Sequence, residues 1–167
     1  MVGARPAAHL TVVSGPSTVG LDKVIELVRA RTSAVRMPVP VTTRHRRAHE
    51  VDGVHYAFVD PATFDRLVAG DALLEWAQVG GNRYGTPRGP VEAWLAAGQP
   101  VLLAIDPQGA ALVRAAVPDA RLVYVAPPGG RVPPDFDVAI AYDSAERAAE
   151  ELVGLLGSPF LTPARPQ

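Results

Sequence analysis

Apolar residues fall along this chain in two alternating patterns, which predict strands and helices in turn. Leu10–Val13 is a short apolar run that includes one threonine, and Val101–Ile105 is an unbroken apolar run, as expected for a strand that is buried on both faces of a sheet. In the segments that follow such runs, apolar positions recur every three to four residues, which predicts helices. Regular alternation of strands and helices favours a three-layer αβα fold around a parallel sheet. The predicted strands are Leu10–Val13, Val101–Ile105, Leu122–Val125 and Val138–Ala141, and the predicted helices are Gly20–Ala30, Pro90–Ala97, Gln108–Val117 and Ser144–Leu156.

The segment between residues 37 and 86 has a different pattern, with more polar residues and a two-residue alternation. Val54–Asp60 alternates as a half-buried strand does, whereas Met37–Thr43 carries two prolines and is predicted as an edge strand. Asp60 followed by Pro61 predicts the start of a helix that ends at Gly70. Two short strands joined by a glycine-rich turn follow. The prediction is a single domain over 1–167, with a core over 9–36 and 87–157, a small mixed β-rich lobe over 37–86 and a loose tail over 158–167.

The composition narrows the classes of function and location. With 167 residues and a formal net charge of −1, the chain has no basic field that would attract nucleic acid or an acidic membrane surface. It has no cysteine, no apolar run long enough to cross a membrane and no apolar segment of a signal peptide, so we expect a cytoplasmic protein. The four histidines show no metal-ligand spacing, and no metal site is predicted. Lys23 is the only lysine beside fifteen arginines, so a phosphate site must use arginine.

The strongest chemical signal lies in the β-rich lobe. Arg44 and Arg47 are three residues apart in a loop, and two guanidinium groups suit a phosphate dianion because each makes paired hydrogen bonds. Tyr56 and Tyr84 each add a hydroxyl donor without another charge. Glu75 lies between apolar neighbours and suits the two adjacent N–H donors of guanine, which one carboxylate accepts together. Taken alone, each residue has an ordinary structural explanation, as a solvated arginine, a half-buried tyrosine or a surface carboxylate.

Taken in order, these residues form the motifs "TTRHRRAHEVDGVHYAFV" and "LLEWAQVGGNRYGTPR", which resemble the guanylate kinase family, whose members transfer a phosphoryl group from ATP to GMP. The resemblance runs from about residue 9 to 128 and resumes from 137 to 156. It implies a P-loop-type fold and a site in which Arg44, Arg47, Tyr56 and Tyr84 hold the GMP phosphate, while Glu75 and Thr86 contact the guanine base. Two base-reading positions depart from the family pattern, because Pro40 replaces a serine and Ala104 replaces the first aspartate of a D-x-D pattern that ends at Asp106.

The ATP side departs further from the family. The phosphate-binding loop of the family reads G-P-S-G-x-G-K-[ST], and this chain has "GPSTVGLD" from Gly15 to Asp22. Gly15, Ser17 and Gly20 are retained. Leu21 replaces the lysine that reaches the phosphates, and Asp22 replaces the hydroxyl that holds Mg²⁺. A carboxylate in the first helical turn also repels phosphate. No catalytic residue is predicted, and the binding of ATP and Mg²⁺ is expected to be lost.

A second difference from the family lies before the last strand. Only the proline- and glycine-rich Pro127–Phe136 precedes it, which leaves no room for the family's lid and the helix after the lid. The sequence therefore predicts a pseudokinase that binds GMP or a related purine monophosphate as a sensor or regulatory module. Two alternatives are a divergent guanylate kinase, or another enzyme acting on a GMP-like substrate, and a protein-interaction scaffold with an empty site. The sheet face without its helix is a predicted surface for a second copy or a protein partner.

Overall fold

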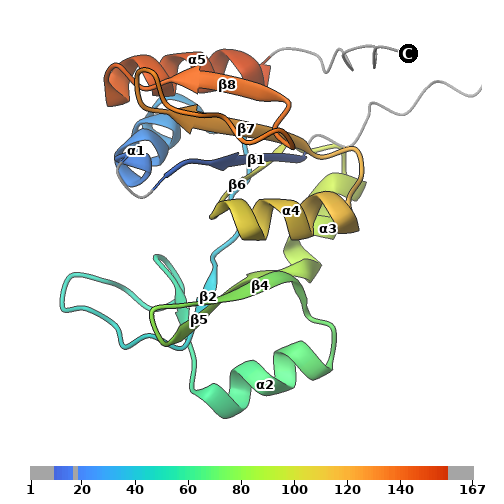
Figure 1. The fold of residues 1–167 in the computed structure, drawn as a ribbon. Coiled ribbons are helices and arrows are strands. Elements are labelled where there is room, and N and C mark those ends of the chain that lie inside the picture. The colour runs from blue at the N-terminus through green and yellow to red at the C-terminus, as the bar shows by residue number, and fades with distance from the viewer. Residues whose placement is uncertain (1–9, 17–18, 158–167) are drawn as a thin grey trace, which may run out of the picture.

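Four parallel strands form the central sheet of this protein, whose computed structural model describes residues 10–16 and 19–157 (Figure 1). The strands lie in the order β6-β1-β7-β8. The first strand, β1, is therefore paired on both sides with strands that come much later in the chain, β6 and β7. Ser17 of the predicted phosphate-binding loop and the predicted loose tail 158–167 lie outside the described residues. The strands are β1 Leu10–Ser14, β6 Val101–Ala104, β7 Arg121–Ala126 and β8 Val138–Ala141.

Helices cover both faces of this sheet, as the alternating apolar pattern predicts (Figure 1). One face packs against α1 (Leu21–Arg31) and α5 (Ala145–Gly157), with Val24 and Leu152 fully buried between helices and sheet. The opposite face packs against α3 (Arg88–Ala96) and α4 (Pro107–Ala116), where Val91 is fully buried. The three-layer αβα prediction is therefore confirmed.

A second, mixed sheet carries the polar segment of the chain. Its order is β3-β2-β5-β4, and β2 pairs with β3 in parallel but with β5 antiparallel. Asp60 caps the following helix through its side chain, which accepts a hydrogen bond from the Thr63 amide at 2.7 Å, and Gly70 ends it as predicted. Gly80 and Gly81, both at positive φ, form the turn between β4 and β5. The elements are β2 Val41–Thr42, β3 Ala57–Phe58, α2 Pro61–Ala69, β4 Leu73–Val79 and β5 Asn82–Pro87.

Two expectations for this sheet are wrong in detail. The strand predicted over Val54–Asp60 pairs only at Ala57–Phe58, because the residues before it form a turn in which the Gly53 amide donates to the Tyr56 carbonyl at 2.7 Å. The segment Met37–Thr43 does not supply an edge strand. Its paired residues begin after the prolines, so that β2 lies between β3 and β5 without a missing backbone donor.

The connection between β7 and β8 contains no helix or strand over residues 127–137, all of which are described. Phe136, in this connection, covers part of the sheet by packing edge-on against Tyr124 of β7, with 5.0 Å between the ring centroids. In β8, Ile140 is buried against the α1 and α5 side, whereas Ala139 and Ala141 are exposed on the opposite side. Among the described helices, none has the length and apolar character needed to cross a membrane.

Candidate functional site

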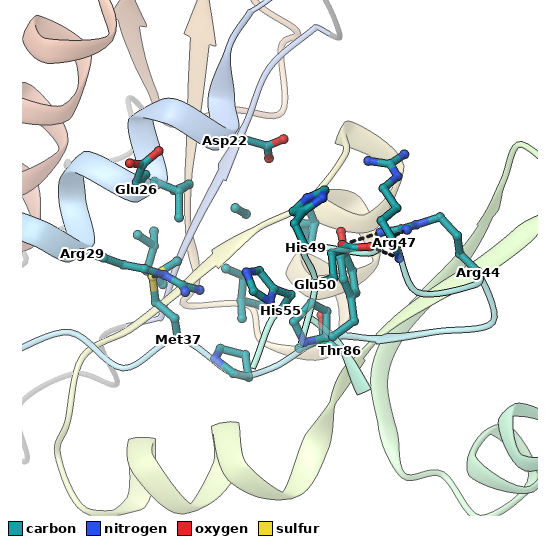
Figure 2. A pocket seen from close by; sticks show the side chains of 18 residues that line it. Asp22, Glu26, Arg29, Met37, Arg44, Arg47, His49, Glu50, His55 and Thr86 are labelled. Atoms are coloured by element: carbon teal, nitrogen blue, oxygen red, sulfur yellow. Dashed lines mark hydrogen bonds and ion pairs between the residues drawn. The ribbon is translucent and has the colours of Figure 1, made fainter. Parts of the chain in front are cut away.

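Two adjoining cavities lie beside the mixed sheet. The larger, of about 600 Å³, has α1 on one side and the loop after β2 on the other (Figure 2). The smaller, of about 280 Å³, extends along β4 and β5. The two share five lining residues, which are Pro40, Tyr56, Thr86, Ala104 and Ile105. All six residues predicted to bind GMP line one or both of them, so the structure brings together Arg44, Arg47, Tyr56, Glu75, Tyr84 and Thr86.

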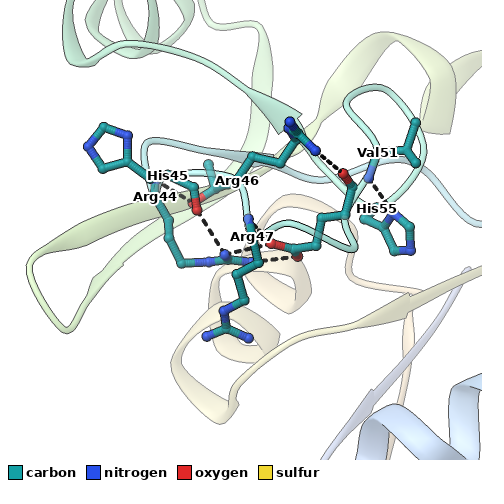
Figure 3. Close-up of polar contacts among 8 residues, drawn as sticks. Arg44, His45, Arg46, Arg47, Val51 and His55 are labelled. Carbon is teal, nitrogen blue, oxygen red and sulfur yellow. Dashed lines mark hydrogen bonds and ion pairs between the residues drawn. The ribbon is translucent and has the colours of Figure 1, made fainter.

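Arg44 is held in a fixed orientation by Glu50 (Figure 3). Its Nη1 donates to Glu50 Oε1 and its Nη2 to Glu50 Oε2, both at 2.8 Å, and Nη1 also donates to the His45 carbonyl at 3.0 Å. The guanidinium lies 5.2 Å from the ring centroid of Tyr56. Of its five N–H groups, these bonds use three and leave Nε–H and one Nη2–H. Arg44 is therefore a rigid cation that still has donors for an anion.

Glu50 is the functional residue that the sequence-based list omits. Its carboxylate also accepts the backbone N–H of Arg47 at 2.8 Å, so that one side chain positions both arginines of the predicted phosphate site. The hydrogen bonds from Arg44 hold the pKa of Glu50 down at about 2, and the pKa of Arg44 is raised in turn. Glu50 is itself part of the T-T-R-x-x-R-x-x-E motif, and this position in the motif was the signal available in the sequence.

Arg47 differs from Arg44 in its surroundings. Its side chain is exposed, lines the larger cavity and points away from Glu50 (Figure 2). No ion pair to Arg47 is found within residues 10–16 and 19–157. One arginine is thus fixed in the wall while the other extends into the cavity, an arrangement that suits a phosphate dianion.

Tyr56 and Tyr84 face each other beside Arg44. Their rings meet edge to face with 6.1 Å between centroids. Burial raises the pKa of the Tyr56 hydroxyl, as do Tyr84 and, from across the cavity, the carboxylate of Asp22, while Arg44 opposes the shift without cancelling it. Tyr56 therefore keeps its proton and acts as a hydrogen-bond donor over a wide pH range.

Glu75 and Thr86 form the polar end of the smaller cavity. They are directly opposite each other in the β4–β5 pair, and the Thr86 hydroxyl donates to Glu75 Oε1 at 2.7 Å. Glu75 is only 8% exposed. Burial raises its pKa above that of an ordinary glutamate and the charge of Asp106 adds to this effect, while the Thr86 hydrogen bond opposes it. The site therefore holds a buried acceptor whose second oxygen, Oε2, has no hydrogen bond from the residues described.

The first turn of α4 lies close to this carboxylate. A Cβ at Gly109 would be 3.0 Å from Glu75 Oε2, so glycine lets the helix start approach the acceptor. Asp106, the retained aspartate of the D-x-D pattern, caps the same helix by accepting the Gly109 amide at 2.7 Å. Ala104 and Pro40, the two departures from the family pattern, line both cavities and add apolar surface where polar groups were expected.

Gly15, the first residue of the phosphate-binding loop, lies directly against β7. A Cβ at Gly15 would be 2.7 Å from the carbonyl oxygen of Val125, so only glycine fits against β7 here. The side chain of Leu21 packs against the core formed by α1, α5 and the sheet and does not line either cavity. Lys23 pairs with Glu26 at 3.4 Å on the exposed surface and does not line either cavity.

Comparison with known proteins relates this arrangement to a single family. The Guanylate kinase family model matches residues 7–156. The guanylate kinase of Thermobifida fusca is 46% identical, over 90% of this chain and 92% of that protein, and the guanylate kinase of Streptomyces coelicolor is 42% identical over 91% of each. Among solved structures, guanylate kinase from Anaplasma phagocytophilum superposes with a TM-score of 0.75 and 29% identity, over 90% of this chain and 85% of that one.

These findings correct the functional prediction. The expectation of a pseudokinase that has lost ATP binding and phosphoryl transfer is wrong, since relatives that are 46% and 42% identical over most of the chain are guanylate kinases. They favour the alternative of an enzyme. The prediction gave two side chains, Leu21 and Asp22, more weight than the backbone amides and helix start that provide most contacts in a phosphate-binding loop. Similar over nine tenths of its length in both sequence and fold, the chain belongs to the guanylate kinase family.

Proposed function

We propose that this chain is a divergent guanylate kinase that transfers the γ-phosphoryl group of ATP to GMP. The observation that carries the proposal is the pairing of a cationic end, built by Arg44 and Arg47, with a buried carboxylate, Glu75, at the other end of two adjoining cavities. A nucleoside monophosphate has the same polarity, with a dianion at one end and hydrogen-bond donors on the base at the other.

At the phosphate end, Arg44 supplies its remaining N–H donors from a fixed position, and Arg47 binds the phosphate from the cavity side. The hydroxyl groups of Tyr56 and Tyr84 complete the set of donors. In the reaction, one oxygen of the bound GMP phosphate forms a new bond to the γ-phosphorus of ATP, and the bond from that phosphorus to the β–γ bridging oxygen breaks, which yields ADP and GDP. The cations lower the repulsion between the two phosphate groups as they approach.

At the base end, the ionised Glu75 accepts the N1–H and N2–H groups of guanine, and Thr86 holds the carboxylate in place through its 2.7 Å hydrogen bond. Adenine has no N–H group at N1, so a buried carboxylate here disfavours AMP by leaving an acceptor unpaired. Pro40 and Ala104 remove two polar contacts of the family pattern, which concentrates base recognition on Glu75.

The proposal is tested by following ADP formation with GMP, AMP and inosine monophosphate as acceptors in the presence of ATP and Mg²⁺. We expect turnover with GMP and much less with AMP. A pure, folded preparation that binds GMP but forms no ADP would contradict the proposal. The loss of ATP and Mg²⁺ binding expected from the sequence is incompatible with this proposal, and calorimetry with ATP, with and without Mg²⁺, tests it directly.

We also propose that the predicted partner surface is used by a second copy of the chain. The support is that β8 is an edge strand and that Ala139 and Ala141 are exposed on the face that no helix of residues 127–137 covers. Light scattering at high protein concentration is expected to give the mass of a dimer, and Ala139→Glu to give that of a monomer. A wild-type mass of one chain at all concentrations would refute this arrangement.

A further inference from the structure

Membership of the guanylate kinase family implies a donor nucleotide that is accompanied by Mg²⁺, and the side chains at the start of α1 decide how this chain would hold it. Leu21 is packed into the core and offers no charge. Asp22, the next residue, offers two carboxylate oxygens, which are hard ligands of the kind that Mg²⁺ prefers. The chemistry of the donor set at this turn therefore fits a divalent cation, although it does not fit bare phosphate.

The carboxylate of Asp22 is directed into the larger cavity. Figure 2 shows it projecting from α1 toward the side that carries Arg47 and His49, and it is one of the lining residues. Asp22 is exposed, and in the described part of the chain its carboxylate makes no side-chain hydrogen bond or ion pair. Glu26, one turn further along the same helix face, instead has its Oε1 paired with Lys23 at 3.4 Å. Of these two carboxylates, Asp22 is the one with unused oxygens.

Two further observations concern the charge of Asp22 and the end of the strand before the loop. The negative charge of Asp22 acts on the predicted GMP site across the cavity, because it contributes to the raised pKa of Tyr56. Ser14, at the end of β1 directly before the loop, is fully buried, and its Oγ has no hydrogen-bond partner among residues 10–16 and 19–157. A buried hydroxyl without a partner is uncommon in proteins.

We infer that the Asp22 carboxylate is a ligand of the divalent cation that accompanies the donor nucleotide, and that this chain therefore requires the metal in order to bind its donor. The inference rests on the proposed kinase function. Mg²⁺ in such enzymes is commonly bound through one or two carboxylates together with substrate phosphates. This sharing is needed here, since the described side chains include no group of three His, Asp or Glu residues that would hold a metal alone.

The change of two residues reverses the electrostatic sign of the loop. Relative to the family signature, Leu21 removes one positive charge and Asp22 adds one negative charge. A bare nucleotide polyphosphate is then repelled from the helix start. A divalent cation placed between the carboxylate and the phosphates turns this repulsion into attraction on both sides. A loop with the family's lysine attracts the nucleotide with or without metal, whereas this loop requires the metal.

The test is isothermal titration calorimetry of the full chain, without GMP, using Mg²⁺–ATP in one series and ATP with EDTA in the other. The wild type is expected to bind Mg²⁺–ATP and to show no heat with metal-free ATP. Asp22→Asn removes the ligand charge and the repulsion together. It should weaken Mg²⁺–ATP by at least about tenfold, since loss of even an outer-shell partner costs about 10- to 100-fold, and it should strengthen metal-free ATP. Glu26→Gln, the matched control on the same helix face, should change neither series.

Any of the following results would overturn the inference: wild-type binding that is equally strong with and without metal, an Asp22→Asn variant that keeps the wild-type metal dependence, or a Glu26→Gln variant that loses as much as Asp22→Asn. Absence of wild-type binding in both series would also overturn it and would establish the loss of ATP and Mg²⁺ binding. The ADP-formation assay separates the two proposals. Turnover with an unaltered metal dependence in Asp22→Asn refutes the role of Asp22 alone, whereas absence of turnover in the wild type refutes the kinase function.

Discussion

Replacing Glu75 by glutamine tests base recognition with a change of one atom. The Thr86 hydroxyl, which donates to Oε1 at 2.7 Å, favours the orientation in which the glutamine oxygen keeps that bond and its NH₂ group occupies the position of Oε2. We expect the N2 amino group of guanine to meet Oε2, so that in the variant it faces the NH₂ group and one hydrogen bond to a charged acceptor is lost. Such a bond contributes about 1.5–3 kcal/mol, which corresponds to about 10- to 150-fold in kcat/KM.

Inosine monophosphate is the matched substrate, because its base keeps the N1–H donor and lacks the N2 amino group. The ratio of kcat/KM for GMP to that for inosine monophosphate should therefore fall by about 10- to 150-fold in Glu75→Gln. Glu151→Gln, an exposed substitution on α5, serves as the control and should leave the ratio unchanged. An unchanged ratio in a Glu75→Gln protein with the wild-type thermal midpoint would refute the assignment of Glu75 to the base.

The same residue predicts a pH dependence whose sign follows from its burial. Because burial raises the pKa of Glu75, the carboxyl group takes up its proton at a higher pH than an ordinary glutamate does. The protonated form accepts fewer hydrogen bonds from guanine, so the KM for GMP should rise as pH falls through this raised pKa. Glu75→Gln should lack that rise, and a pH profile that is identical in both proteins would exclude Glu75 as its source.

Three further predictions concern the phosphate site and the loop at β1. Arg44→Ala combined with Arg47→Ala should abolish GMP binding in calorimetry, whereas Arg66→Ala, an arginine on α2 outside both cavities, should leave it intact; unchanged affinity in the double variant would refute the site. Glu50→Gln should raise the KM for GMP more than it lowers kcat, because its carboxylate orients both arginines; an effect on kcat alone would argue against a positioning role. Gly15→Ala should lower stability by about 1–3 kcal/mol, since its Cβ would lie 2.7 Å from a carbonyl oxygen of β7, while Gly154→Ala, where a Cβ meets nothing within 4 Å, should not; equal thermal midpoints would contradict the packing argument.

Local signals in the sequence were sufficient for most elements of the fold. Apolar runs predicted the parallel strands, and Asp60 with Pro61 predicted the start of α2, because these features depend on neighbours within a few residues. The motif order also singled out the arginine, tyrosine and glutamate residues that line the cavities. The extent of β3 was overestimated because pairing depends on the partner strand, and the alternating pattern of residues 54–60 contains no information about that partner.

Tertiary structure alone decided how these residues act on one another. The sequence placed Glu50 in a motif, and only the folded loop brings its carboxylate within 2.8 Å of both terminal nitrogens of Arg44. The sequence likewise showed a leucine and an aspartate at two loop positions and led to the wrong conclusion that the enzyme was inactive. In the folded chain Leu21 belongs to the core and Asp22 faces the cavity. The type of a residue is local information, whereas the charge that its side chain meets depends on segments that folding brings together from distant parts of the chain.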